Sequence, residues 1–142
     1  MRKGYTPSVG SVFAVQIGMS ISQPRLPSAS DLRAAFLACL RAHEACEAAV
    51  THVLRRDDGA VDERVSALLD CADVCRATAR HIRHGSPLLR GTAGVAAELC
   101  ERAAEACAAL ASVPVMLGYA EACRRSAACC RRVADVPLER AA

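Results

Sequence analysis

Apolar residues recur every three or four positions along most of this chain, the spacing that gathers them on one face of an α-helix. The first such segment is expected to begin after Ser28 or Ser30, with Asp31 in its first turn, and to end near Arg56, because Asp57-Asp58-Gly59 breaks the pattern. Its predicted inward residues are Leu32, Phe36, Cys39, Ala42 or His43, Cys46, Val50 and Val53.

A second helical segment is expected from near Val61 to His84, with Gly85 ending it. Asp62 and Glu63 suit the positive N-terminal end of the helix dipole, and basic side chains gather in the last turn. Its predicted inward residues are Val65, Leu68, Cys71, Cys75, Thr78 and Ile82.

A third helix is expected to start at Ser86-Pro87, a good N-cap followed by a proline in the first turn, and to continue to about Ala111. Gly91 and Gly94 weaken its first two turns, so its regular part is expected to begin only near Val95.

A fourth helix is expected to start at Ser112-Val113-Pro114 and to run to about Ala134. Four long helices joined by short connections are typical of an antiparallel up-down-up-down bundle, so we predict an all-α four-helix bundle with a cysteine-lined core. The chain has 142 residues, enough for one domain. The expected organisation is a flexible N-terminal extension at 1–28, the bundle at 29–135 and a C-terminal tail at 136–142.

Composition agrees with closely packed helices and excludes several functions. Apolar residues make up 53% of the chain but aromatic residues only 3%, so the core must be filled by Ala, Leu, Val and Cys. The net charge is only +3, with Arg interleaved with Glu and Asp, so nucleic acid is not an expected partner. No apolar run approaches a membrane span, and no phosphate loop or hydrolase triad is visible, so neither a membrane association nor hydrolytic chemistry is expected.

The nine cysteines carry the strongest signal. Each expected helix has at least two on one face, four or seven residues apart. Residues seven apart in a helix are separated by about 10 Å, beyond the roughly 7 Å limit for a disulfide. Reduced thiols and a cytoplasmic location are therefore expected. Cys129 follows a different direction from its neighbour Cys130, by about 100° around the helix, and is expected to face a helix interface.

Antiparallel packing predicts which cysteines lie at the same level of the bundle. Cys46 should face Cys71, Cys71 should face Cys100, and Cys100 should lie near Cys123 and Ser126. Cys107 is expected toward the connection between the first two helices. Cys39, Thr78 and Cys130 are expected toward the opposite end.

A column of thiols favours a soft metal: Cu(I), Zn(II) or an iron-sulfur cluster. Zinc and iron-sulfur sites usually use CxxC spacings, and this sequence contains none. Cu(I) accepts two thiolates, so it is the predicted metal. The predicted metal ligands are Cys39, Cys46, Cys71, Cys75, Cys100, Cys107, Cys123, Cys129, Cys130 and His43.

The histidines each have a second interpretation. His43 lies between two cysteines, where it is either a ligand or a hydrogen-bonded structural residue. His81 and His84 lie at a helix C-terminus, where a cation offsets the dipole, and they are also placed to admit a metal at that end. His52 is expected on the surface, and Met116 is expected to fill the core.

Three stretches resemble the bacterial cysteine-rich four-helix-bundle copper-binding proteins, the copper storage proteins: CADVCRATA from Cys71, ELC to AC from Glu98, and EACRRSAACCRR from Glu121. The resemblance covers about residues 31–134. It implies an interior lined with cysteines that hold many Cu(I) ions, with His or Met at one end admitting the metal. This chain has fewer cysteines than the family pattern, with Thr78, Ala103 and Ser126 at positions where a thiol would be usual.

The first functional hypothesis is therefore Cu(I) binding, storage or buffering in copper homeostasis. The loss of some thiols leaves open a copper-dependent oxidoreductase that uses a few cysteines and His43, although a non-enzymatic protein is favoured. A metal-free helical interaction module is the third interpretation. Copper ions are the expected partner, and the sequence leaves open a copper-delivering chaperone and a homo-oligomer.

Overall fold

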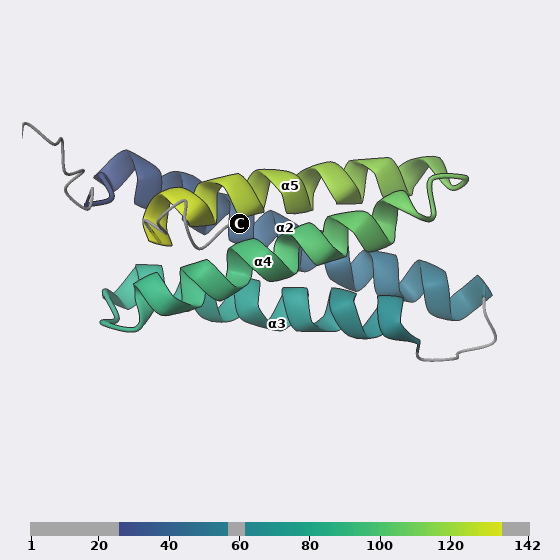
Figure 1. Cartoon of the computed structure of the whole chain (residues 1–142), viewed down its shortest axis with the longest axis horizontal. Coiled ribbons are helices and arrows are strands. Elements are labelled where there is room, and N and C mark those ends of the chain that lie inside the picture. The colour runs from purple at the N-terminus through teal and green to yellow at the C-terminus, as the bar shows by residue number, and fades with distance from the viewer. Residues whose placement is uncertain (1–25, 57–61, 135–142) are drawn as a thin grey trace, which may run out of the picture.

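The computed structural model describes residues 26–56 and 62–134, and this part of the chain forms four helices without strands. They are α2 (Ala29–Arg56), α3 (Glu63–His84), α4 (Leu89–Ala108) and α5 (Pro114–Ala134). Figure 1 shows them lying side by side with successive helices antiparallel, which confirms the predicted bundle. The predictions for residues 1–25, 57–61 and 135–142 lie outside the described residues.

The start of α2 is fixed by a reciprocal cap. The Asp31 backbone N–H donates to the Ser28 hydroxyl over 3.0 Å, and the Ser28 backbone N–H donates to the Asp31 carboxylate over 3.0 Å. Two backbone N–H groups that lack a helical acceptor are thereby satisfied. Of the two serines that the sequence allowed, Ser28 therefore sets the helix start.

Both ends of α3 carry strong caps. The Asp62 carboxylate accepts from the backbone N–H groups of Arg64 and Val65, each over 3.0 Å. At the other end Gly85 has φ +65°, and the N–H groups of Gly85 and Ser86 donate to carbonyls of the last turn. This left-handed ending is the Schellman arrangement, which favours glycine because a Cβ would crowd the following carbonyl.

The limits of α4 differ from the prediction. Its helix begins at Leu89, because Ser86 caps a turn: the Ser86 hydroxyl accepts from the Leu88 N–H over 3.1 Å. The helix is regular from that point, so the expected irregularity up to Val95 is wrong. It ends at Ala108 and not at Ala111, since the next residues form turns in which backbone N–H groups donate to carbonyls three residues earlier, and these turns lead into Pro114.

The core lies along the axis of the bundle, where small side chains allow close helix approach. Helix α2 packs between α3 and α5, and α4 completes the ring between the same two helices. Alanine and cysteine make up most of the buried apolar residues, with larger side chains such as Leu68, Met116 and Val133 filling the remainder. The predicted inward faces of α2 and α3 are largely confirmed, with Ala42 buried and His43 only partly so.

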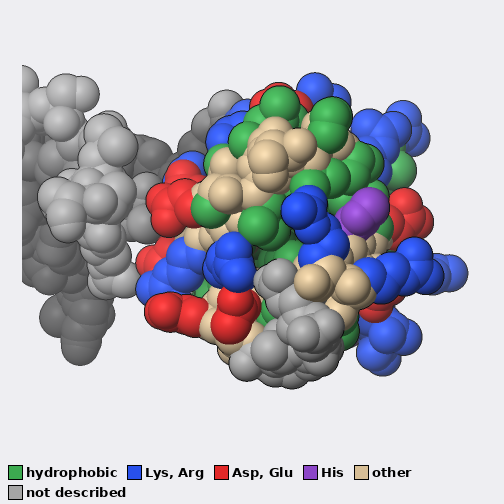
Figure 2. Space-filling view, turned by 90° about the vertical axis from the view of Figure 1, so that its right-hand side faces the viewer, with side chains coloured by type: hydrophobic (Ala, Val, Ile, Leu, Met, Phe, Trp, Pro, Cys, Tyr) green, Lys and Arg blue, Asp and Glu red, His purple; other side chains and the backbone are tan. Residues whose placement is uncertain are grey.

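The outer surface mixes charges of both signs. Arg131 on α5 pairs with Glu101 on α4, and Arg132 lies 3.8 Å from Asp31 on α2. Figure 2 shows one end of the bundle, where basic and acidic side chains are interspersed around apolar surface. Within the ranges described, none of the helices combines the length and apolarity needed to cross a bilayer.

Candidate metal centre

The sulfur atoms converge on the axis of the bundle. All nine cysteines are buried free thiols, and eight of them have no exposed surface. They come from all four helices, because cysteines four or seven residues apart share one helical face and that face is the apolar one. The prediction of a cysteine-lined core is confirmed.

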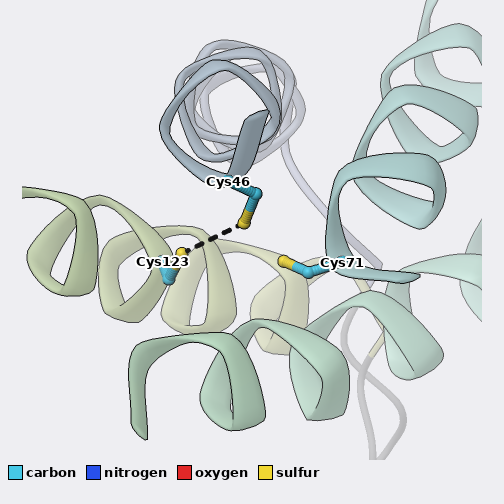
Figure 3. Close-up of side chains that lie close together, drawn as sticks. All are labelled: Cys46, Cys71 and Cys123. Atoms are coloured by element: carbon cyan, nitrogen blue, oxygen red, sulfur yellow. Dashed lines mark hydrogen bonds between the residues drawn. The ribbon is translucent and has the colours of Figure 1, made fainter. Parts of the chain in front are cut away.

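The first close group joins three different helices. Cys46 on α2, Cys71 on α3 and Cys123 on α5 point toward one another in Figure 3. Their sulfur atoms all lie within 4.8 Å of one another, and Cys46 and Cys123 are 3.6 Å apart. One soft ion placed among them would have three sulfur neighbours.

The second close group contains Cys71 again, together with Cys75 and Cys100. The Cys71 and Cys75 sulfurs, one helical turn apart on α3, are separated by 3.9 Å. The Cys100 sulfur on α4 lies 3.6 Å from Cys71 and 3.4 Å from Cys75. Cys71 therefore belongs to both groups and joins them into a set of five sulfurs, which we call the core five: Cys46, Cys71, Cys75, Cys100 and Cys123.

A further pair lies nearer the end of the bundle where α3 meets α4. The sulfurs of Cys39 on α2 and Cys130 on α5 are 3.4 Å apart. We call these two residues the end pair. The Ser126 hydroxyl lies beside them, 3.7 Å from the Cys39 sulfur and 3.9 Å from the Cys130 sulfur, and it is 3.8 Å from the Cys75 sulfur of the core five.

The two remaining cysteines stand apart from these contacts. Cys107 on α4 is fully buried, and within the described ranges no sulfur hydrogen bond joins it to the others. Cys129 is 6% exposed and accepts a hydrogen bond from the Arg132 guanidinium over 3.2 Å. Its contact agrees with the expectation that Cys129 points away from the interior column.

Proton sharing between neighbouring thiols shapes the electrostatics of the column. In the end pair, the hydrogen bond between the sulfurs lowers the pKa of Cys39 and raises the pKa of Cys130. The same effect lowers the pKa of Cys123 and raises that of Cys46. One thiolate in each pair is stabilised by the S–H of its neighbour, while a second negative charge is strongly opposed unless a cation accompanies it.

Cys107 behaves differently because desolvation, and not a hydrogen bond to a neighbouring thiol, is the largest influence on its pKa. Desolvation raises the pKa of Cys107 to about 12, with a smaller increase from the charge on Cys123. A thiol with this environment stays protonated and unreactive at neutral pH. It becomes a ligand only when a bound cation compensates its charge.

His43 is held by groups other than the thiols. Its Nδ1 lies 2.9 Å from the Ala72 carbonyl oxygen, and its Nε2 lies 3.4 Å from the Glu47 carboxylate. These contacts match the structural role that the sequence left open for this residue.

The other histidines lie toward the two ends of the bundle. The His81 Nδ1 is 3.0 Å from the Thr92 hydroxyl, and the His81 and His84 rings meet edge to face at 5.8 Å. This pair lies at the end of α3, on the same side as the end pair of cysteines. His52 is half-buried against Tyr119 and lines a cavity of about 130 Å³ with Met116.

The predicted levels agree with the observed sulfur contacts. Cys46 is grouped with Cys71, and Cys71 contacts Cys100, as expected from the antiparallel packing. For Ser126 the sequence predicted only a position near Cys100 and did not reveal the contacts that its hydroxyl makes with the end pair. Its spacing from Cys130, four residues on the same helix, was the available signal.

The donor set is suited to a soft cation. In the part of the chain that is described, both groups of three potential ligands consist of buried cysteines alone, without carboxylates. Thiolates select Cu(I) or other soft ions over Mg²⁺ and Ca²⁺, which require oxygen ligands. Binding would release the thiol protons, because the thiolate and not the thiol is the ligand.

Comparison with known proteins adds an independent observation. The family model described as "Csp: Copper storage protein" matches residues 28–135, a range that covers all four helices. No curated protein and no solved structure shows a significant match to the chain.

Proposed function

The chain belongs to the copper storage protein family, and we propose that it stores copper as Cu(I) held between thiolates along the axis of the bundle. Two separate observations support copper binding. The family assignment rests on the sequence, and the buried cysteine groups rest on the positions of the sulfur atoms.

The observation that carries the proposal is the sharing of Cys71 between two buried groups of sulfurs. A sulfur that touches two groups is placed to bridge two ions, so the core five hold more copper than isolated pairs would. With nine thiols and two ligands per ion, unshared binding would allow about four ions, and bridging would raise that number.

The oxidation state in the proposal rests on ligand chemistry. Cu(I) is a soft ion that accepts two or three thiolates, whereas Cu(II) prefers nitrogen and oxygen ligands in a square arrangement. The close sulfur groups supply thiolates in a dry environment. Storage as Cu(I) therefore requires no change of oxidation state at the site.

We propose the seven contacting cysteines and Cys107 as the ligands. The seven are the core five and the end pair, and Cys107 extends the same interior line. Cys129 and His43, which the sequence also suggested, contact Arg132 and the Ala72 carbonyl instead, so we leave them out of the proposed set.

A cytoplasmic location is part of the proposal. Nine free thiols persist best in a reducing compartment, and an oxidising one would convert close pairs such as Cys39 and Cys130 into disulfides. The expected partners are copper ions. Delivery by a chaperone and assembly into a homo-oligomer remain predictions from the sequence.

Anaerobic copper loading tests the proposal. The reduced protein is incubated with excess Cu(I), separated from unbound metal, and analysed for copper per chain. Several tightly held ions are expected, with little oxygen consumption when air is admitted. A chain that retains fewer than two ions would contradict storage.

A further inference from the structure

A groove lies on the outside of the bundle where α2 and α3 meet. Its volume of about 370 Å³ falls within the range of small-molecule sites. Apolar side chains of α2 and a row of guanidinium groups on α3 line it together. We call it the arginine groove, and its residues are Phe36, Leu40, Arg76, Ala79, Arg80 and Arg83.

The arginines of the groove follow one face of α3. Arg76, Arg80 and Arg83 are spaced four and three residues apart, so they lie on successive turns of the helix. All three are exposed, and none forms an ion pair with a carboxylate among the residues that the structure describes. Even Asp73, one turn before Arg76, is not paired with it. Like charges on neighbouring turns repel one another, and an anion bound among them would remove that repulsion.

The α2 side of the groove is apolar. Leu40 is exposed over 36% of its surface, and Phe36 packs partly against the core. Ala79, at the boundary with α3, is nearly fully buried. An anion that carries apolar atoms would bury those atoms against α2 while its negative groups meet α3. The groove therefore favours a small organic anion over an inorganic one.

The inner side of the same helix interface carries thiols. Cys39 lies between Phe36 and Leu40 on α2, and Cys75 lies one turn before Ala79 on α3. These two thiols interact directly, since a hydrogen bond from Cys75 lowers the pKa of Cys39. Their contact joins the end pair to the core five. An ion that reaches it therefore has access to the whole column of sulfurs.

Copper chemistry supplies an anion of the required kind. In a solution of small thiols Cu(I) is held between two thiolates, and the complex is negatively charged even before carboxylates on the thiol are counted. On transfer, two S–Cu bonds to the small thiol break and two S–Cu bonds to cysteines form. The two cysteine protons pass to the departing thiolates, and no electron is transferred.

Resting on the proposed storage function, we propose that the arginine groove binds carboxylate-bearing small thiols and their Cu(I) complexes, and exchanges copper with the Cys39–Cys75 contact behind it. The three arginines bind the carboxylates of the thiol. Phe36 and Leu40 contact its apolar atoms. Copper then crosses a single helix interface to reach the column.

Binding is measured first without copper, so that it does not depend on storage. The probe is S-methylglutathione, which keeps the carboxylates of glutathione, a tripeptide thiol, but has no free thiol. Titration into the reduced, metal-free protein is followed by heteronuclear NMR. Backbone amide shifts are expected in α2 and α3 around the groove, and they should weaken as salt is added. Absence of shifts, or shifts confined to other helices, would overturn the proposal.

A charge-removing variant tests delivery. Arg76→Gln, Arg80→Gln and Arg83→Gln together should abolish the shifts caused by the probe. The same variant should take up copper from the Cu(I)–glutathione complex about tenfold more slowly than the wild type, since an anionic complex is no longer attracted to the groove. Uptake is followed anaerobically by stopped-flow absorbance of the Cu(I)–thiolate bands. An unchanged rate would overturn the proposal.

The matched control removes three exposed arginines outside the groove. It combines Arg55→Gln, Arg102→Gln and Arg125→Gln, so its net charge equals that of the groove variant. This control should bind the probe and take up copper as the wild type does. Equal slowing in both variants would show an effect of net charge and would overturn the assignment to the groove.

A neutral carrier separates the groove from the store. Cu(I) offered as its 2-mercaptoethanol complex, which has no carboxylate, should enter the wild type and both variants at rates that differ far less. Copper per chain at saturation should be equal in all three, because no cysteine is changed, and circular dichroism checks that each is folded. A wild type that takes up no copper from either carrier would overturn the storage function, even where probe binding to the groove is intact.

Discussion

At the scale of single residues, Cys71 occupies a special place among the nine thiols. It is the member common to both close groups, while Cys75 and Cys46 each belong to one. Removing a shared ligand affects every ion that uses it, whereas removing a cysteine outside the proposed ligand set, such as Cys129, affects none. The effect of a substitution should therefore follow position in the network and not burial alone.

Replacement of Cys71 should lower the copper capacity by more than one ion per chain, because both groups lose a sulfur. The variant Cys71→Ser keeps a side chain of similar size, and copper per chain after anaerobic loading is the measurement. Cys129→Ser, also buried but bonded to Arg132, should keep full capacity. Equal losses in the two variants would contradict the shared-ligand geometry.

Cys107 should make the metal-free protein less stable at alkaline pH. An unfolded cysteine ionises near pH 8.5, while burial raises the pKa of Cys107 to about 12 in the folded chain. Between these values the unfolded state binds fewer protons, so the free energy of unfolding falls as pH rises. Below about pH 8.5 both states keep the proton and the contribution is fully present.

The slope of stability against pH measures this effect. Cys107→Ala should flatten the fall in unfolding free energy between pH 9 and pH 11 by at most about 1.4 kcal/mol per pH unit. Denaturant unfolding under reducing conditions supplies the data. The variant will also be less stable overall because it leaves a cavity, so the comparison is between slopes. Parallel slopes would show that Cys107 is not desolvated.

Single residues also mark the limit of what the sequence predicts. Cysteine positions followed from helical periodicity, which also placed Cys129 away from the column. The direction of the His43 ring did not, because an imidazole beside two cysteines is equally able to turn toward a backbone carbonyl. The contacts of Ser126 with the end pair depend on the exact stagger between α2 and α5, which spacing along one helix does not define.

At the scale of the helices, capping residues set the boundaries more sharply than propensity did. Ser28 and Gly85 are where capping chemistry placed them, whereas α4 begins and ends inside its predicted range. The glycines in its first turns did not disturb the helix, since packing of the buried alanines such as Ala93 and Ala96 outweighs a propensity cost of about 1 kcal/mol.

Two glycine substitutions should have opposite effects on stability. Gly85→Ala places a Cβ on a residue with φ +65° and should lower the unfolding free energy by about 1 kcal/mol. Gly91→Ala lies within α4 with open space around it and should raise the unfolding free energy by about 1 kcal/mol. Thermal unfolding followed by circular dichroism is sufficient to see both.

The control is built into this comparison, because both substitutions add the same methyl group at an exposed position. Gly118, on α5 with nothing near its added Cβ, should behave like Gly91. A stabilising Gly85→Ala would mean that the left-handed ending of α3 is not populated in solution.

At the scale of the whole molecule, the fold follows from sequence more completely than the metal site does. Four amphipathic segments with short connections leave few arrangements other than an antiparallel bundle, and the observed helix neighbours agree with that arrangement. The number of ions held depends on sulfur distances of 3.4 to 3.9 Å. Those distances arise from side-chain rotamers and helix stagger, which no periodic pattern specifies.

Copper should stabilise the chain without being needed for folding. Alanine, valine and leucine contacts form the core beside the thiols, so the metal-free chain should already show helical circular dichroism. A ligand that binds the folded state at 1,000 times its dissociation constant adds about 4 kcal/mol, so the melting temperature should rise by many degrees on loading. An unchanged melting temperature would favour the metal-free interaction module.

The close sulfur contacts run mostly between helices: the end pair and the Cys46–Cys123 contact join α2 to α5, while Cys100 joins α4 to α3. An ion bound at one of these contacts would link two neighbouring helices through its sulfur ligands. Release of the ion then requires the two helices to separate transiently. The residence time of copper should therefore depend on the rate of this local motion and not on the affinity of an external chelator. A small thiol that can enter between the helices should therefore remove copper from the protein faster than a bulky chelator of equal affinity.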